Sequence, residues 1–254
     1  MRTKIVIANW KMKLEIPESV QLAKKLKLAF LKKLWQGQVI LCPDFLSLPT
    51  CGQALLKSKI KLGAQNCFWQ DKGSYTGEVS INNLRNLKVE YVILGHSERR
   101  RYFKESNLQV ASKAKLVLTN NITPIVCIGE SLSDYRNKKT LFTLKKQLKG
   151  SLQGIKLKTK EKLIIAYEPV WAIGSGKSLE AKQVAKILKF LKEETKKIPA
   201  LSKMISSIFF IYGGSVNSQN VQNMATFKDI QGLLVGSDSL QVKSFTKICQ
   251  DFLS

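Results

Sequence analysis

Three side chains that are far apart in the chain could together move a proton beside a carbonyl group. Glu168 ends the apolar run Leu163–Glu168, and His96 and Lys11 each follow another apolar run. A carboxylate base, an imidazole and a lysine form a set suited to moving a proton next to a carbonyl. The sequence therefore indicates proton transfer, provided that the fold brings these three side chains together.

Other chemistries have less support in the residues. His96 is the only histidine in the chain, which excludes a histidine-rich metal site. The serines and cysteines show no nucleophile elbow, the motif in which a serine stands between two glycines at alternate positions. We expect an enzyme that uses neither a metal nor a cofactor.

The segment that follows Glu168 could form a movable cover. Pro169 lacks a backbone donor and favours an extended Glu168, and an amphipathic helix is predicted from about Ser178. A strand end, a carboxylate and a glycine-containing loop then lie in one segment, Ala166–Lys177, so a base and a lid could share it. The end of this segment is similar to a phosphate-binding P-loop, but Trp171 stands where that motif requires glycine.

Two glycine-containing segments are candidates for phosphate binding. They are Gly213-Gly214-Ser215 and Gly236-Ser237, which follow the last two apolar runs. We expect both segments to bring backbone N–H groups to the start of a helix, where unpaired donors and the helix dipole favour an anion.

Eight apolar runs alternate with helical patterns along the chain. The runs are nearly continuous, as expected for parallel strands that helices cover on the outside. The predicted strands are Lys4–Asn9, Gln38–Cys42, Ile60–Gln65, Tyr91–Gly95, Thr123–Ile128, Leu163–Glu168, Ile208–Tyr212 and Gly232–Val235. The helical patterns recur at Ala23, Leu26, Phe30 and Leu34, at Leu141, Leu144 and Leu148, and at Val184, Ile187, Leu188 and Leu191.

This alternation predicts an α/β protein with a single (β/α)8 barrel over residues 1–254. Eight strand–helix units in 254 residues fit a barrel of this type. A doubly wound open sheet is the alternative, but it would usually show a glycine-rich turn after the first strand. Asn9-Trp10-Lys11 stands there instead. In a barrel, all the polar segments named above would meet at the carboxyl ends of the strands.

The net charge of +24 raises the alternative of a polyanion-binding protein. Lysines are spread along nearly every predicted helix, with no zinc-finger or aromatic RNA-recognition pattern, so we interpret them as a solvated surface and expect nucleic-acid binding to be incidental at most. The five widely spaced cysteines indicate reduced thiols in a cytoplasmic protein. No apolar run has the length of a membrane span.

The chain resembles the triosephosphate isomerase family over nearly its whole length. The matching segments are Asn9–Met12, Gly63–Asn66, Gly73–Glu78, Gly95–Arg100, Cys127–Glu130, Ala166–Lys177, Tyr212–Val216 and Gly232–Gly236. The resemblance implies interconversion of dihydroxyacetone phosphate and D-glyceraldehyde 3-phosphate through an enediol(ate), a step of glycolysis and gluconeogenesis. It implies that Glu168 is the base, that His96 acts as a neutral imidazole, and that Lys11 stabilises negative charge.

The resemblance also implies roles for residues around these three. Asn9 would lie beside Lys11 in the substrate site, and Glu98 would position Lys11. Cys127 would pack beneath the base, where an ordinary core thiol is the simpler interpretation. Substrate phosphate would be held by Gly174, Ser215, Gly236 and Ser237. The loop Pro169–Lys177 would close over the substrate and exclude water.

A homodimer is the remaining implication. The segment Cys67–Glu78 resembles the family's interface loop, which inserts into the partner subunit. Lys13 stands where the family usually has asparagine, near the expected contact, and is expected to weaken it. Ser175 replaces a threonine in the lid. Ser237-Asp238 replaces a common glycine–alanine pair, and we expect Asp238 to point away from the bound phosphate.

Two alternatives to the isomerase stay open at this stage. One is a barrel whose main activity is polyanion binding through its lysines, and the other is a different phosphate-handling barrel enzyme. The first has no need of the Lys11, His96 and Glu168 set, and the second would share the glycine segments but not the Glu-Pro-Val-Trp sequence at Glu168.

Overall fold

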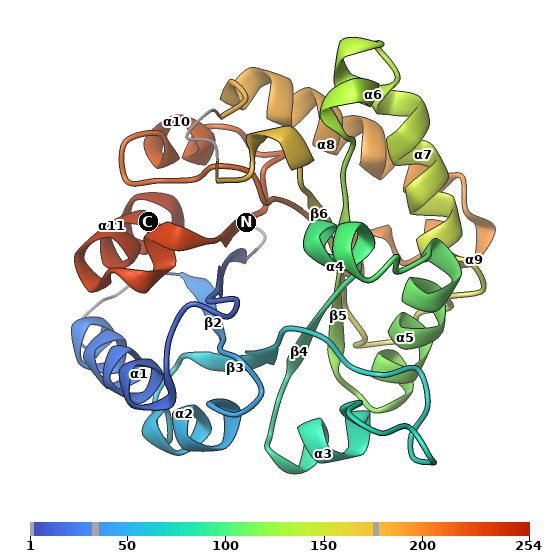
Figure 1. Ribbon diagram of the computed structural model, residues 1–254. Coiled ribbons are helices and arrows are strands. Elements are labelled where there is room, and N and C mark those ends of the chain that lie inside the picture. Colours follow the sequence, from blue (N-terminus) through green and yellow to red (C-terminus); the bar gives the residue numbers. More distant parts are fainter. Residues whose placement is uncertain (1–2, 32–35, 175–177) are drawn as a thin grey trace.

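The computed structural model describes residues 3–31, 36–174 and 178–254 of the chain. Eight parallel strands form a closed barrel in sequence order, and the helices form a ring around it (Figure 1). The strands are β1 (Lys4–Asn9), β2 (Gly37–Cys42), β3 (Lys61–Ala64), β4 (Tyr91–Leu94), β5 (Thr123–Ile128), β6 (Leu163–Tyr167), β7 (Ile208–Tyr212) and β8 (Gly232–Val235). The predicted fold class is therefore confirmed.

The helices lie between the strands in the order that the apolar patterns predict. They are α1 (Ile16–Phe30), α2 (Leu48–Ala54), α3 (Ile81–Asn86), α4 (Ser97–Tyr102), α5 (Asn107–Thr119), α6 (Leu132–Arg136), α7 (Thr140–Ser151), α8 (Ala181–Lys196), α9 (Pro199–Ser202), α10 (Val221–Ala225) and α11 (Val242–Leu253). Three short 3₁₀ turns add η1 (Val170–Ala172), η2 (Ile205–Ser207) and η3 (Ser237–Leu240). None of the described helices combines the length and apolar character that a bilayer crossing requires.

Pairing of the first strand with the last closes the barrel. Ile5 of β1 is in register with Gly232 of β8, while Lys4 is in register with Gly37 on the other side. Alternate strand residues then point into the barrel or out toward the helices. The inward set forms its own core cluster: Ile5, Ile7, Ile40, Cys42, Tyr91, Ile93, Ile125, Cys127, Ile164, Ala166, Phe209, Ile211 and Leu234. Both faces of each strand are apolar for this reason.

The helices pack on the barrel through the stripes that the sequence shows. α8 buries Val184, Leu188 and Leu191, and burial of each such side chain contributes roughly 1.5–3 kcal/mol relative to exposure. Side-chain caps fix where several helices begin. At α5, for example, Ser106 accepts from the Gln109 backbone N–H and the Gln109 side chain accepts from the Ser106 N–H.

Some predicted boundaries differ from the structure by one to three residues. β4 ends at Leu94 because Gly95 takes a left-handed backbone, with φ at +68°. The helix predicted from about Ser178 begins at Ala181. Leu141 is half exposed, so the buried stripe of α7 starts at Leu144. Leu34 of the first stripe lies outside the described residues.

Candidate active site

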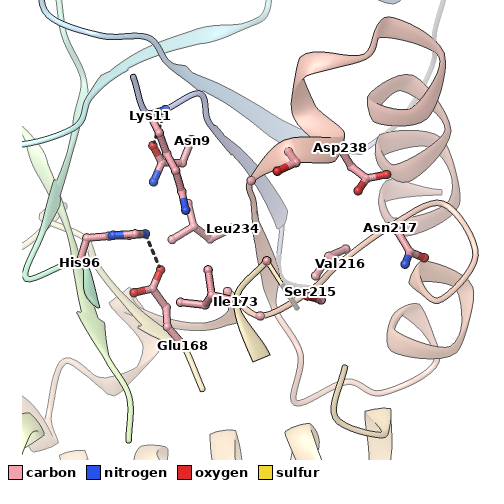
Figure 2. Close-up of a pocket in the computed structure, with 15 residues that line it drawn as sticks. Asn9, Lys11, His96, Glu168, Ile173, Ser215, Val216, Asn217, Leu234 and Asp238 are labelled. Carbon is pink, nitrogen blue, oxygen red and sulfur yellow. Dashed lines mark hydrogen bonds and ion pairs between the residues drawn. The ribbon is translucent and has the colours of Figure 1, made fainter. Parts of the chain in front are cut away.

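The polar residues expected at the carboxyl ends of the strands line one cavity of about 230 Å³ (Figure 2). Asn9 is the last residue of β1, His96 follows β4 by two residues, and Glu168 follows β6 directly. The cavity brings together the eight residues that the sequence analysis expects to act in catalysis or substrate binding: Asn9, Lys11, His96, Glu168, Gly174, Ser215, Gly236 and Ser237. The strand ends of a closed barrel converge, so residues distant in the chain become neighbours.

His96 and Glu168 are in direct contact at the base of this cavity. His96 Nε2 lies 3.2 Å from Glu168 Oε1, and the Ser97 backbone N–H donates to Glu168 Oε2 over 3.3 Å. Glu168 is 1% exposed and His96 is 5% exposed. A carboxylate in a buried position needs such donors, because an unpaired charge there would be costly.

The backbone of α4 determines the tautomer of His96. The Glu98 backbone N–H donates to His96 Nδ1 over 3.3 Å, so Nδ1 carries a lone pair and the proton lies on Nε2. Glu98 Oε2 is also 3.5 Å from Nδ1, but an ion pair there would require a proton on Nδ1 that the backbone N–H would then oppose. We therefore assign a neutral imidazole with its proton on Nε2, the atom that lies 3.2 Å from Glu168 Oε1.

Lys11 lies on the same side of the cavity as His96, since the Glu98 carboxylate is close to both (Figure 2). Its Nζ lies 2.7 Å from Glu98 Oε1, and its backbone N–H donates to Asn9 Oδ1 over 3.1 Å. The backbone of Lys11 is left-handed, with φ at +55°, which is costly for a residue with a side chain. Gln65 Nε2 donates to the Lys11 carbonyl over 2.9 Å and to Cys42 O over 3.0 Å, so it helps to hold this conformation.

Two glycines allow other segments to approach Glu168 closely. A Cβ at Gly129 would lie 1.6 Å from the Glu168 carbonyl oxygen, and a Cβ at Gly213 would lie 2.8 Å from Glu168 Cγ. The Glu168 N–H also donates to Ile128 O over 2.8 Å. Any larger residue at Gly129 would have to displace the backbone that carries the carboxylate.

Cys127 points into the barrel from β5 and lies close to Glu168. It is fully buried, and this burial, together with the nearby Glu168 carboxylate, raises the pKa of its thiol well above the ordinary value. A neutral, buried thiol is a packing group and not a nucleophile. Arg100 lies beside it and donates from Nη2 to Cys127 O over 3.1 Å.

The two glycine segments differ from their expected geometry in one respect. Gly236 caps η3, so it does stand at a helix start, and a Cβ there would meet nothing within 4 Å. Gly213 to Ser215 do not, because the next helix, α10, begins only at Val221. The prediction of a helix start after β7 is therefore wrong. Gly214 has a packing role instead, since a Cβ there would lie 2.2 Å from the Tyr212 hydroxyl oxygen.

Hydrogen bonds connect the described part of the predicted lid to residues that follow the strands of the barrel. Trp171 Nε1 donates to Glu130 Oε1 over 2.9 Å, and Tyr167 donates to the same oxygen over 3.2 Å. Burial raises the pKa of Glu130, while these two donors act in the opposite direction. Ser215 Oγ donates to Ala172 O over 2.6 Å. Residues 175–177, including the expected Ser175 and the end of the predicted lid, lie outside the described residues.

Asp238 lines the outer part of the cavity but is turned toward α11. Ser244 Oγ donates to Asp238 Oδ1 over 2.7 Å. In Figure 2 the Asp238 carboxylate points away from Lys11, His96 and Glu168.

Several residues that organise the site had no role in the sequence analysis. Gln65, Gly129 and Glu130 fall in segments that match the family, but nothing in their spacing indicated what they contact. Ser97 acts through its backbone N–H, which no side-chain pattern can reveal.

A closed barrel whose polar residues converge at the carboxyl ends of its strands defines a (β/α)8-barrel enzyme. The family model described as triosephosphate isomerase matches residues 4–252. The triosephosphate isomerase of Clostridium tetani is 39% identical over 250 residues, which are 98% of this chain and 96% of the relative. The triosephosphate isomerase of Dictyoglomus turgidum is 39% identical over 248 residues, with 98% and 99% covered. The chain belongs to the triosephosphate isomerase family, and it is a glycolytic enzyme with that family's activity.

Proposed function

We propose that Glu168, His96 and Lys11 carry out the isomerisation in the cavity at the carboxyl end of the barrel. Glu168 is the base that carries the proton between the two carbons of the substrate. The observation that supports this assignment most directly is the 3.2 Å contact between His96 Nε2 and Glu168 Oε1 at one end of the cavity. A substrate placed there can face a proton acceptor and a proton donor at the same time.

The substrates are dihydroxyacetone phosphate and D-glyceraldehyde 3-phosphate, which interconvert through an enediol(ate). Removal of the carbon-bound proton by Glu168 places negative charge on the substrate oxygens. The Nε2–H of a neutral His96 polarises and then protonates these oxygens, and the Lys11 ammonium offsets their charge. Asn9 and Glu98 fix the position of Lys11, which they contact at 3.1 Å and 2.7 Å.

The phosphate of the substrate binds at the other side of the cavity. Its partners are Gly174, Ser215, Gly236 and Ser237, all of which line the same cavity. At Gly174 and Gly236 a Cβ would meet nothing within 4 Å, so these backbones face open space that an anion can enter. Cys127 packs behind the base and takes no part in the chemistry.

The lid, Pro169–Lys177, closes over the bound substrate and excludes water. Exclusion of water strengthens each charge interaction in the site and protects the enediolate from loss of phosphate. Two hydrogen bonds, from Trp171 to Glu130 and from Ser215 to the Ala172 carbonyl, hold the first part of this loop in place and support this proposal.

A coupled assay with D-glyceraldehyde 3-phosphate tests the assignment of the base. We expect the wild-type chain to convert this substrate, and we expect kcat of Glu168→Ala to be at least ~10³-fold lower than that of wild type. Circular dichroism checks that the variant is folded. A folded Glu168→Ala protein with near-normal turnover would remove Glu168 from the mechanism.

The active form is proposed to be a homodimer through the loop Cys67–Glu78. In this loop the Phe68 ring lies 4.6 Å from the Tyr75 ring, and Tyr75 is still 43% exposed. Met12, which lies beside Lys11, is 92% exposed. Exposed apolar side chains next to the catalytic lysine support a contact with a second copy.

Sedimentation at a series of protein concentrations tests the dimer and the effect of Lys13. We expect a dimer whose dissociation constant falls at least ~5-fold in Lys13→Asn, because a cation leaves the contact. Lys24→Asn, on the exposed face of α1, is the matched control and should leave the dissociation constant unchanged. A wild-type chain that is monomeric at every concentration would contradict the proposal.

We further propose that residues 1–254 form one domain and that the enzyme works in the cytoplasm. The single domain is supported by the one closed barrel, which includes all eight strands. The cytoplasmic location is supported by the five cysteines, which are buried free thiols.

A further inference from the structure

The charged residues in the loops are distributed unevenly between the two ends of the barrel. Segments that enter the strands lie at the amino end, and segments that leave the strands lie at the carboxyl end, where the active site is. Among the described residues, the loops that join a helix to the next strand contain ten lysines and three acidic residues. The lysines are Lys57, Lys59, Lys88, Lys156, Lys158, Lys160, Lys162, Lys197, Lys203 and Lys228, and the acidic residues are Glu90, Glu161 and Asp229.

At the carboxyl end, acidic residues outnumber lysines in the described loops. The described loops on the strand-to-helix side, including those that follow the short helices α4 and α6, contain six lysines and nine acidic residues. The lysines are Lys11, Lys13, Lys72, Lys104, Lys138 and Lys139, and the acidic residues are Glu15, Asp44, Asp71, Glu78, Glu105, Glu130, Glu168, Glu180 and Asp238. The excess of positive charge in the loops is therefore confined to the end that takes no part in catalysis.

The amino end also has a hollow into which several of these lysines project. It has a volume of about 490 Å³ and lies between the starts of β3, β4, β5 and β6. Lys158, Lys160 and Lys162 line it and are exposed, and within the described residues none of them pairs with a carboxylate. Two acidic residues in the hollow are already engaged. Glu90 lies 3.0 Å from Lys61 Nζ, and Glu161 accepts from the Lys158 backbone N–H over 2.7 Å.

We propose that the amino end of the barrel binds the phosphate backbone of double-stranded nucleic acid without sequence preference. Ammonium groups that come from separate loops and face one side can each contact a different phosphate of a duplex. The active site lies at the far end of the barrel, so the enzyme stays active while it is bound.

The side chains around these lysines favour a duplex over other polyanions. Single strands bind proteins largely by base stacking on aromatic rings. The exposed aromatic residues of the described chain are Tyr75, Tyr102, Phe103, Tyr135 and Phe142, and none lies in an amino-end loop. Stable contacts with a membrane surface or with another protein also bury apolar area. The exposed large apolar side chains in these described loops are Leu31 and Leu56.

Fluorescence anisotropy with a labelled DNA duplex of about 24 base pairs tests the proposal on the full chain. The test variant is the triple change Lys158→Gln, Lys160→Gln and Lys162→Gln. The matched control is Lys104→Gln, Lys138→Gln and Lys139→Gln, which removes the same charge from exposed positions outside the amino-end loops. Both variants should keep wild-type turnover, which shows that they are folded.

We expect the test variant to bind the duplex at least ~10-fold more weakly at about 100 mM salt and the control to bind within ~2-fold of wild type. The slope of log K against log salt should become shallower by about 2.7 in the test variant, since each lost phosphate contact accounts for about 0.9. Equal losses in the two variants would overturn the proposal, because net charge alone would then explain binding. Tighter binding to a single-stranded oligonucleotide or to anionic phosphatidylglycerol vesicles than to the duplex would overturn it as well.

Discussion

The Nε2 atom of His96 lies 3.2 Å from the Oε1 atom of Glu168. The imidazole and the carboxylate are therefore in contact. Since the Glu98 N–H donates to His96 Nδ1, the proton of a neutral ring lies on Nε2, the atom that faces Glu168. In the proposed mechanism, a substrate oxygen that enters the cavity takes up this proton donor while Glu168 acts as the base.

Shortening the base by one methylene group should reduce turnover without unfolding the chain. We expect Glu168→Asp to lower kcat at least ~10²-fold, because proton transfer requires close approach of the carboxylate to carbon. The coupled assay measures this effect. Glu180→Asp makes the same chemical change at an exposed residue outside the cavity and should stay within ~2-fold of wild type. Near-normal turnover of Glu168→Asp would exclude a role in which the reach of this side chain matters.

A methyl group at Gly129 should displace the backbone of Glu168. Its Cβ would lie 1.6 Å from Glu168 O, so Gly129→Ala should lower kcat at least ~10-fold and the free energy of unfolding by about 1–3 kcal/mol. Kinetics and urea unfolding measure the two effects. In Gly52→Ala, on helix α2, the nearest atom would be Leu62 Cδ2 at 3.3 Å. This control should change stability by no more than about 1 kcal/mol. Wild-type kinetics in Gly129→Ala would show that the close approach is not needed.

Asp238 should have little effect on phosphate binding as long as Ser244 holds it. We expect Asp238→Ala to change KM by less than ~10-fold, which corresponds to about 1.4 kcal/mol. Ser244→Ala removes the donor at 2.7 Å and leaves the carboxylate free to rotate, so KM should rise in that variant. A KM that improves more than ~10-fold in Asp238→Ala would mean that the carboxylate faces the phosphate.

The buried thiols should make the fold less stable at high pH. Burial raises the pKa of Cys51 to about 12 and the pKa of Cys67 to about 12, and that of Cys249 well above its ordinary value. Above a pH of about 9 the unfolded thiols lose protons that the folded ones keep, so the free energy of unfolding falls as pH rises. The loss approaches about 1.4 kcal/mol per pH unit for each thiol.

Urea unfolding between about pH 8 and pH 10 measures this slope below the range in which most tyrosines titrate. Cys249→Ala removes one buried thiol in α11. The free energy of unfolding of this variant should fall less steeply with pH, by the contribution of one thiol. A slope that is flat in the wild-type chain would show that the thiols titrate equally in the folded and unfolded states.

The strands and the order of the fold could be predicted because the apolar runs are continuous and regularly spaced. Strands in a barrel are buried on both faces, and this leaves a pattern that needs no knowledge of contacts. The ends of these strands were less predictable. Gly95 leaves β4 through a left-handed backbone, a choice that depends on the chain around it.

The candidate site could be predicted in part for a similar reason. Glu168 and His96 lie within two residues of a strand end, so the barrel topology alone brings them to one end. The groups that hold them act through the backbone or through close approach, as Ser97 N–H and Gly129 do, and such contacts exist only in three dimensions. The uneven distribution of lysines was hidden in the same way, because successive loops along the chain belong to alternate ends of the barrel.

The charge difference between the two sets of loops makes the amino end of the barrel more basic than its mouth. Such a molecule does not meet a charged solid phase in random orientations, since its more basic end is drawn to an anionic matrix first. Enzyme adsorbed on a cation-exchange bead would therefore sit with the mouth of the barrel toward the liquid, where substrate can reach it.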